Sequence, residues 1–176
     1  MSQTLPPPST LPTLPTPQQT HTLDLLFEPS PPLHTLILPL LLTQTFDSYP
    51  SLIEAIRSEL LSLTKTDTTT LSSILCSHPR LGEKKVDSAQ SAAEQKQLQG
   101  DGEEAEMLRA LNKEYEERFP GLRYVVFVNG RPRPVIMQNM RERIARGDIE
   151  AERLEAIHAM CDIALDRAGK LQKSKM

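Results

Sequence analysis

One stretch of the chain, residues 76–95, carries the residue types of an acid–base site. It has the sequence CSHPRLGEKKVDSAQSAAEQ and contains His78, Ser91, Glu94 and Gln95. A proline follows His78, and proline disfavours helical angles in the residue before it, so the imidazole is predicted to lie in a loop after a helix. Ser91, Glu94 and Gln95 are spaced i, i+3 and i+4, which places them on one helix face. An imidazole facing a carboxylate, a hydroxyl and an amide could bind a small molecule and transfer a proton to it.

The same residues also fit a purely structural role. Ser91 and Glu94 have the Ser-x-x-Glu spacing of a capping box, in which the serine starts a helix and the glutamate bonds back to its backbone N–H. The His-Pro-x-Leu-Gly that begins at His78 could likewise be only a helix end followed by a turn. On spacing alone this structural interpretation is favoured, because single motifs of this kind often arise by chance.

Length and charge narrow the class of protein. The chain has 176 residues and a formal net charge of −3, which indicates one domain large enough for a hydrophobic core. Without a basic excess we expect no nucleic-acid partner. The first Lys or Arg is Arg57, so the N-terminal part lacks the positive charge of secretory or mitochondrial targeting segments. The apolar run at 33–42 has only about half the length needed to span a bilayer, so we expect no membrane partner.

Cysteines and short motifs give no sign of a metal or a cofactor. Cys76 and Cys161 form neither a metal-binding pattern nor a disulfide framework. Cys76 and His78 could supply two zinc ligands, but no second pair follows them. The sequence also lacks a Gly-rich phosphate loop and a Gly-x-Ser-x-Gly elbow. We therefore expect no metal site and, for an enzyme, no cofactor.

The N-terminal segment differs in composition from the rest. Residues 1–19 are rich in Pro, Thr, Ser and Leu and carry no charge. A segment of this composition is expected to bury too little surface to offset its loss of conformational entropy. We predict a disordered tail at 1–19, whose deletion would leave folding and activity intact. A helical domain at 20–170 and a C-terminal tail at 171–176 would follow. The repeated Leu-Pro-Thr could instead be a docking motif for a proline-binding module.

Helical patterns dominate the remaining sequence. Ser51 and Glu54 are spaced as a capping box before an apolar repeat of three- and four-residue steps. Pro134 suits a helix start and Gly147 a helix end, and Asp148 is placed to cap the last helix. Helices are predicted at 23–27, 36–42, 52–63, 71–77, from 88, at 103–119, from 134 to 147, and after 148. The predicted fold class is an all-α, single-domain helical bundle.

One short extended segment interrupts this pattern. Residues 123–128, RYVVFV, form the only strand-like run, and Asn129-Gly130 follows them. A hairpin would be usual here, but the partner side is Arg-Pro-Arg-Pro, which cannot supply a regular ladder. The backbone groups of a lone extended segment must bond to something else. A ligand could be their partner, or the segment could serve as an apolar plug of the core.

Four sequence blocks carry a family resemblance. They are HPRLGEKK, SAAEQ, LNKEYEERFPGLRYVVFVNGR and Ile163-Ala164-x-x-Arg167. In this order they resemble the OHCU decarboxylase family, over residues 23 to 167. The resemblance implies decarboxylation of 2-oxo-4-hydroxy-4-carboxy-5-ureidoimidazoline (OHCU), an intermediate of urate breakdown, to (S)-allantoin. It also implies a homodimer.

The resemblance points to particular residues. It implies that His78 is the proton donor, and we expect Glu94 to position or accept the proton of the substrate hydroxyl. The predicted substrate-binding residues are Pro79, Ser91, Gln95, Tyr124, Val125, Val126, Phe127, Val128 and Arg167. Residues 124–128 would bind through their main chain. Arg167 could alternatively interact with helix carbonyls near the C-terminus.

Other residues depart from the family pattern or stay outside the predicted site. Arg80 stands where many members carry an acid, and the spacer between the His-Pro and Ser-x-x-Glu-Gln blocks is short. Asn112 and Tyr115 match a family block but are interpreted as a surface polar residue and a core aromatic. Three arginines of the helix after Pro134 are predicted to be solvated: Arg141, Arg143 and Arg146.

The last three residues suggest a destination. Ser174, Lys175 and Met176 nearly match the Ser-Lys-Leu peroxisomal address. Because urate oxidation is commonly peroxisomal, we expect a peroxisomal protein that binds the import receptor through these residues, and otherwise a cytoplasmic one. The alternative to an enzyme is a non-catalytic helical interaction module that acts through its Pro-rich tail and acidic helix.

Overall fold

The computed structural model describes residues 4–83, 89–95 and 102–173. Within these ranges the chain forms helices and loops without a strand, so the predicted all-α fold class is confirmed. In chain order the elements are η1 (Pro8–Thr13), α1 (Thr16–Phe27), α2 (Pro31–Thr43), α3 (Tyr49–Thr66), α4 (Thr68–Leu75), α5 (Ala89–Gln95), α6 (Glu103–Arg118), α7 (Arg133–Arg146) and α8 (Ile149–Lys173).

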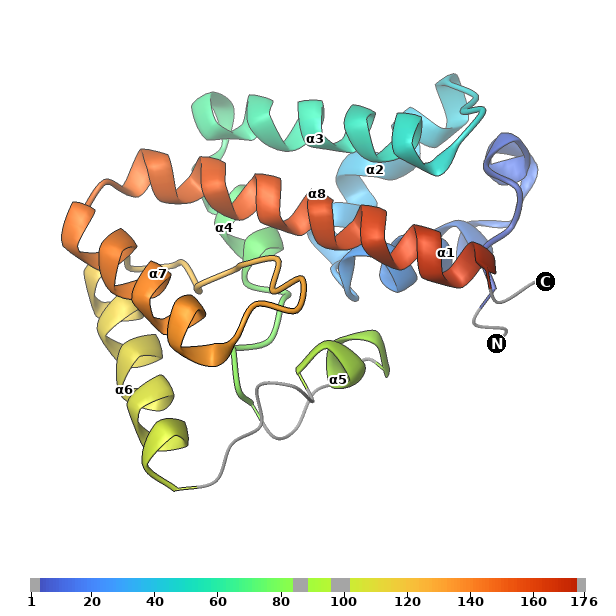
Figure 1. Ribbon diagram of the computed structural model, residues 1–176. Helices are drawn as coiled ribbons and strands as arrows, with labels where there is room; N and C mark the ends of the chain where they lie inside the picture. Colours follow the sequence, from blue (N-terminus) through green and yellow to red (C-terminus); the bar gives the residue numbers. More distant parts are fainter. Residues whose placement is uncertain (1–3, 84–88, 96–101, 174–176) are drawn as a thin grey trace.

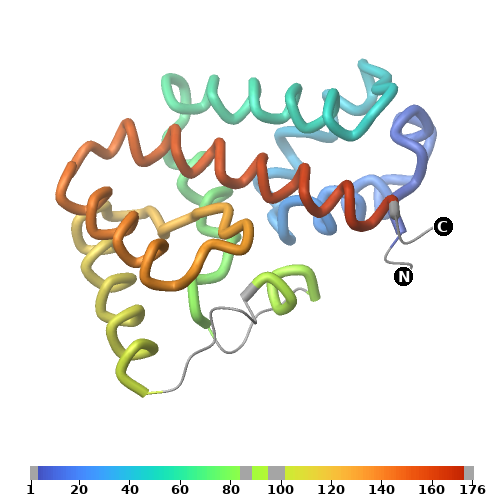
Figure 2. The backbone as a smooth tube through the Cα atoms, in the orientation of Figure 1, coloured from blue at the N-terminus to red at the C-terminus, as the bar shows by residue number. Residues whose placement is uncertain are grey.

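Helix α8 is the element around which the others are arranged. It runs beside α3 and also packs against α1 and α4 (Figure 1). Helices α6 and α7 pair at one end of the molecule, and η1, α1 and α2 form the other end (Figure 2). Ile157, Met160, Cys161 and Ala164 of α8 are fully buried. Because α8 spans both ends, its side chains can meet residues from distant parts of the sequence.

Helix α3 begins earlier than the sequence pattern predicts. Ser48 is its N-cap and accepts a hydrogen bond of 3.2 Å from the backbone N–H of Ser51. Ser51 is therefore the third helical residue and not the cap, and the predicted box of Ser51 and Glu54 is wrong. Pro50 explains the shift, because a proline in the first helical turn removes an N–H that has no partner inside the helix.

The prediction of a disordered tail at 1–19 is wrong for the residues that the structure describes. Leu5 and Leu11 are each 1% exposed. The Tyr49 hydroxyl donates to the Pro6 carbonyl at 2.7 Å, and the Gln19 side chain donates to the Leu11 carbonyl at 2.8 Å. The segment packs on α2, and α1 already begins at Thr16. The argument from composition was wrong because a few leucines bury enough apolar surface to order the segment once α2 and α3 provide a surface on which they can pack.

We predict that Leu11→Ala lowers the free energy of unfolding by about 2–5 kcal/mol, since it empties a buried site. Urea denaturation followed by circular dichroism measures this change. Gln18→Ala, at an exposed position of α1, serves as the control. A Leu11→Ala variant as stable as the control would mean that the N-terminal segment does not pack in solution.

The turn between α7 and α8 confirms the sequence prediction. Gly147 is the C-cap of α7 with φ 66°, a left-handed conformation that favours glycine. A Cβ atom at this position would lie 1.9 Å from a guanidinium nitrogen of Arg118. The Asp148 carboxylate then accepts hydrogen bonds from the backbone N–H groups of Glu150 and Ala151, at 3.0 and 3.1 Å. This turn directs α8 back across the molecule.

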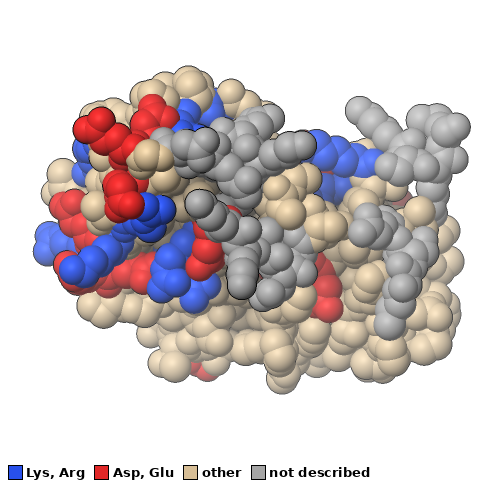
Figure 3. Space-filling model, turned by 90° about the horizontal axis from the view of Figure 1, so that it is seen from below, with Lys and Arg blue, Asp and Glu red and all other residues tan. Residues whose placement is uncertain are grey.

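Charged side chains of both signs lie intermingled at the α6–α7 end (Figure 3). Arg133 of α7 pairs with Glu104 of α6, and Lys113 pairs with Glu117 within α6. Much of the remaining described surface in this view is uncharged. In the described part of the chain no single helix is long and apolar enough to cross a membrane; α1 and α2 pass that test only as a pair bent by 119°.

Candidate active site

His78 lies in the loop after α4, as its position before a proline predicts. The Arg123 guanidinium donates to the carbonyls of Cys76 and His78, at 2.9 and 3.3 Å. The Asn112 side chain donates to the Leu81 carbonyl at 3.0 Å. Asn112 is 6% exposed, so its interpretation as a surface residue is wrong: it anchors this loop. The loop that carries His78 is thus held from two sides.

The side chain of Arg80 does not line the cavity at His78. Its guanidinium pairs with Glu116 of α6, with nitrogen–oxygen distances of 2.6 and 2.9 Å. It lines a separate cavity of about 580 Å³ beside α6 and is absent from the residues that line the cavity at His78. The departure from the family pattern at Arg80 therefore places no cation beside the imidazole.

The His78 imidazole is buried and neutral. The residue is 5% exposed, and its Nε2 atom is buried without a hydrogen-bond partner among the described residues. Burial, and secondly the positive charge of Arg167, lower the pKa of His78 to about 4, although Glu28 opposes this shift. A buried ring nitrogen at the wall of a cavity is available to a ligand that can bond to it.

Helix α5 supplies Ser91 and Glu94 to the same region. Ser91 is 2% exposed and is the third residue of α5, so it is not the helix N-cap, and the capping-box interpretation is wrong. Its hydroxyl donates to the Glu28 carboxylate. The Glu94 carboxylate accepts from Arg167. Gln95 ends the helix, and the placement of its side chain lies outside the described part of the structure.

Arg167 joins these groups from α8. Its guanidinium binds both oxygens of Glu94, at 2.7 and 2.8 Å, and one oxygen of Glu28 at 2.7 Å. It also donates to the Ser91 hydroxyl at 3.1 Å. The residue is 2% exposed. The guanidinium also donates to the Leu26 carbonyl in the last turn of α1, at 3.5 Å, so a contact with a helix carbonyl, the alternative for this arginine, is present as well. Binding of a substrate by Arg167 stays a prediction.

Glu28 is the member of this cluster that the sequence argument missed. It caps the C-terminus of α1 with φ 80° and is 3% exposed. Burial alone would raise the pKa of Glu28, but the charge of Arg167 and the hydrogen bonds from Ser91 and Arg167 outweigh it and lower the pKa. The only local signal was an acid between a phenylalanine and a proline at the end of an apolar run.

The extended segment at 122–128 is held by a second buried ion pair. Arg143 donates to the Val125 carbonyl at 3.0 Å and pairs with Glu152 at 2.7 Å. Its guanidinium lies 4.7 Å from the centre of the Tyr124 ring. Arg143 is 4% exposed, so the prediction that it is solvated is wrong. Glu152 of α8 is also fully buried, and its negative charge offsets the cost of burying the Arg143 guanidinium.

The two other arginines that were predicted to be solvated, Arg141 and Arg146, are more exposed than Arg143. Arg141 is exposed, as expected. Arg146 is 39% exposed at its side chain but reaches Glu152 at 2.5 Å, so it contributes to the same network. Tyr115 is a fully buried core residue, as expected, and its hydroxyl donates to Glu152 at 2.5 Å.

The backbone of residues 124–128 offers donors. Arg131 donates to the carbonyls of Phe127 and Val128, at 2.5 and 3.3 Å, and Arg143 occupies that of Val125. No backbone carbonyl among the described residues accepts from the N–H groups of 124–128. Backbone N–H groups that are buried need a partner, and binding of a ligand by these groups stays a prediction.

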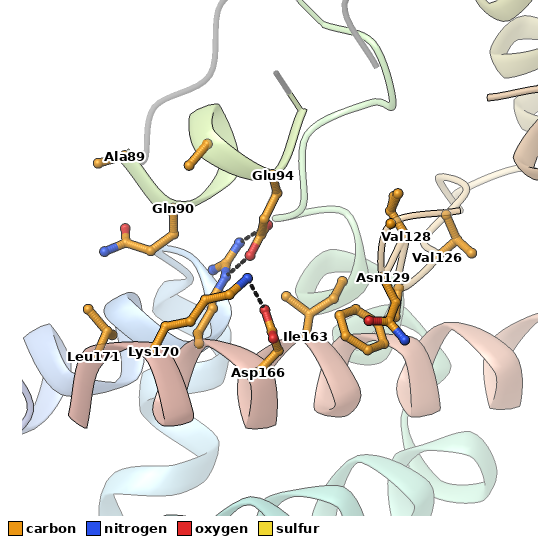
Figure 4. Close-up of a pocket in the computed structure, with 14 residues that line it drawn as sticks. Ala89, Gln90, Glu94, Val126, Val128, Asn129, Ile163, Asp166, Lys170 and Leu171 are labelled. Carbon is orange, nitrogen blue, oxygen red and sulfur yellow. Dashed lines mark hydrogen bonds and ion pairs between the residues drawn. The ribbon is translucent and has the colours of Figure 1, made fainter. Parts of the chain in front are cut away.

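Most of the predicted site residues share one continuous space. A cavity of about 40 Å³ is lined by His78, Pro79, Leu81, Ser91, Glu94, Tyr124, Val125, Val126, Val128 and Ile163. A larger cleft of about 390 Å³ adjoins it, because Glu94, Val126, Val128 and Ile163 line both. Phe127 and Arg167 line the cleft, with Asp166 and Lys170 at its edge (Figure 4). The cleft has the size of a small-molecule site, whereas the inner cavity holds little more than one water.

The arrangement suits proton transfer to a small anion. It combines a neutral imidazole, a carboxylate held by a guanidinium, a hydroxyl and a row of backbone donors. Among the residues that the structure describes, no group of three or more His, Cys, Asp or Glu is placed to hold a metal ion.

We predict that burial of neutral His78 makes stability depend on pH. The folded pKa of about 4 lies below the ordinary unfolded value near 6.5. Stability from this group is therefore complete above about pH 6.5 and is lost as the pH falls toward 4. When the pH falls from 7 to 5, the free energy of unfolding should decrease by about 2 kcal/mol more in the wild type than in His78→Gln.

Urea denaturation at both pH values measures this difference. His158→Gln, at an exposed position of α8, controls for the loss of a histidine. Equal losses in the wild type and in His78→Gln would contradict a buried neutral imidazole.

Comparison with known protein families found a match that includes this region. A family model described as OHCU decarboxylase matches residues 12–169 of the chain. No curated protein matches the chain. The matched range covers every residue that lines the inner cavity, as well as Glu28 and Arg167. It also begins before residue 20, in agreement with the ordered N-terminal segment.

Proposed function

Because the chain belongs to the OHCU decarboxylase family, we propose that His78, Glu94 and Arg167 carry out the family's reaction where the cleft meets the inner cavity. That reaction, the decarboxylation of OHCU in urate degradation, is the chemistry of a carboxy-lyase. The observation that carries the proposal is the buried Nε2 atom of His78, which has no hydrogen-bond partner in the described part of the chain, together with the cavity that both His78 and Glu94 line. Nothing in the fold favours the alternative of a non-catalytic interaction module.

Arg167 and the extended segment would hold the substrate in the cleft. OHCU carries a carboxylate, and a buried guanidinium can bind a carboxylate through two parallel hydrogen bonds. Arg167 lines the cleft and already binds the Glu94 carboxylate in this way. The N–H groups of 124–128 would bond to the polar edges of the ring and the ureido group.

Decarboxylation breaks the bond between the ring carbon and the carboxylate. The electron pair of that bond passes to the neighbouring C=N group, and backbone donors stabilise the charge that develops there. Glu94 takes the proton of the substrate hydroxyl, which becomes a carbonyl, and returns this proton to the nitrogen of the former C=N group. A proton from His78 then reaches the ring carbon that bears the ureido group. Delivery from one face sets the S configuration of allantoin.

The low pKa of His78 is consistent with this order of events. The imidazole of the free site is neutral at pH 7, because its pKa is about 4. A bound substrate carboxylate adds negative charge beside the ring and raises its pKa. We therefore propose that His78 takes up its proton as the anionic substrate binds. The imidazole is then neutral in the free site and protonated in the complex with the substrate.

We predict that His78→Gln and Glu94→Gln each reduce kcat by about 10²–10⁴, the usual contribution of an acid–base group. Both variants should stay folded, because each removes a charge or a proton without changing side-chain size greatly. The measurements are the initial rate with fresh OHCU and the optical purity of the allantoin formed.

Glu117→Gln, an exposed change on α6, is the control for the loss of an acid. A folded His78→Gln variant that makes pure (S)-allantoin at the wild-type rate would rule out His78 as the proton donor.

We also propose a peroxisomal destination and a homodimer. The first is supported by Ser174, Lys175 and Met176 at the end of the sequence, which lie outside the described residues. The second is supported by the family resemblance, and sedimentation velocity tests it.

For the destination, a fluorescent protein fused to the N-terminus should colocalise with a peroxisomal marker. Deletion of residues 174–176 should make the signal diffuse, because the import receptor binds this tripeptide. Lys170→Ala, which leaves the last three residues intact, is the control. An unchanged distribution after the deletion would show that the tripeptide is not used.

A further inference from the structure

Two carboxylates hold Arg167, and they differ in their access to the cavity. The side chain of Glu94 is 28% exposed and lines both the inner cavity and the cleft. That of Glu28 is 4% exposed and lines neither. Arg167 lies between them, so Glu94 can reach a substrate and Glu28 cannot.

We propose that Glu28 is a positioning residue, which holds the Arg167 guanidinium and the Ser91 hydroxyl in place while Glu94 turns from Arg167 to the substrate. This inference rests on the role proposed above for Glu94. It concerns a residue that acts through Arg167 and Ser91 and does not touch the substrate.

The charge balance of the cluster requires such a residue. The guanidinium of Arg167 is 2% exposed, and a buried cation without an anion is strongly destabilising. Nη2 of Arg167 donates to Glu28 at 2.7 Å and to Glu94 at 2.8 Å. When Glu94 moves to the substrate hydroxyl, Glu28 still pairs with the guanidinium. Arg167 therefore stays aligned to bind the substrate carboxylate.

Ser91 ties the same cluster to α5. Its hydroxyl donates to Glu28 and accepts from Arg167 at 3.1 Å. Glu28 thus connects the end of α1 with α5 and α8. Since Ser91 and Glu94 lie on one face of α5, a displaced Ser91 would also displace the Glu94 carboxylate.

The backbone at Glu28 gives independent support. The residue has φ 80° and ψ 152°, and it is one of two described non-glycine residues with positive φ. Strain of this kind persists where surrounding contacts impose it, often at functional sites. Pro29 accounts for the extended ψ, because it excludes helical angles at the preceding residue. The positive φ turns the carboxylate at this helix end toward Arg167 and Ser91.

The test compares Glu28→Gln, which keeps the size and removes the charge, with Glu28→Asp, which keeps the charge and shortens the reach. We expect Glu28→Gln to lower kcat by about 10–10²-fold, the effect of a slightly misplaced catalytic group. Glu28→Asp should lose less. Asp24→Asn, on the same helix and partly exposed, should keep the wild-type kcat.

A second measurement separates positioning from a general loss of packing. Among the described residues, the charged groups around His78 are Glu28, Arg167 and Glu94, and Arg123 binds its backbone carbonyl. Removing the negative charge of Glu28 should shift the titration of His78 to lower pH, whereas Glu28→Asp should leave it near the wild-type position.

NMR of the histidine ring carbons follows this titration. The chain has four histidines, and the His78 signal is the one missing from His78→Gln. This readout does not depend on catalysis, so it stays informative even if the proposed roles of His78 and Glu94 fail.

A folded Glu28→Gln variant with wild-type kcat and an unchanged His78 titration would overturn the proposal. If Glu28→Gln does not fold, Glu28→Asp decides: a folded Asp variant with lowered kcat and an unshifted His78 titration supports a positioning role. Wild-type kcat in that variant would refute it, because the shorter side chain cannot hold both partners.

Discussion

The ion pairs of the buried Arg167 guanidinium are the interaction on which the arrangement of the candidate site depends. Arg167 lies on α8 and pairs with Glu94 of α5 and with Glu28 at the end of α1. A charge with 2% exposure is tolerated only when oppositely charged groups surround it. Helix α5 has 7 residues, too few for a stable isolated helix. Its contacts with Arg167 therefore help to fix the helix that carries Ser91 and Glu94.

A second buried ion pair stabilises the opposite wall of the site. Arg143 of α7 pairs with Glu152 of α8 and bonds to the Val125 carbonyl. This contact holds the extended segment in place without a neighbouring strand among the described residues. Both ion pairs use α8, so one long helix aligns the carboxylate side and the main-chain side of the cavity. Main-chain donors that are fixed in this way can stabilise charge without rearranging during a reaction.

Tertiary contacts give chemically similar residues different tasks. Glu28 and Glu94 are both glutamates beside Arg167, but only Glu94 lines the cavity. Arg141 and Arg143 are two positions apart on α7, and one is exposed whereas the other is buried beside Tyr124. Residue type could not separate the two glutamates, because their difference arises from how α1, α5 and α8 meet. Helix spacing does place Arg143, three positions after the buried Met140, on another face than Arg141, but only the fold shows that Glu152 lies there to pair with it.

The sequence by itself determined the features that local physics controls. Apolar spacing predicted the helices, Gly147 and Asp148 marked the turn before α8, and the proline after His78 placed the imidazole in a loop. Ordered motifs pointed to the family and to most residues of the cavity. These signals work because helix periodicity, capping and proline sterics act within a few residues.

Only the tertiary structure decided which polar groups are buried and what they bind. It showed that Leu5 and Leu11 pack in the core, that Arg143 is paired with Glu152, and that Glu28 is paired with Arg167. Glu28 and Arg167 are far apart in the sequence, and no local pattern links them. Their burial depends on how α1, α5 and α8 meet, because a buried charge is stable only beside a partner that the fold brings to it.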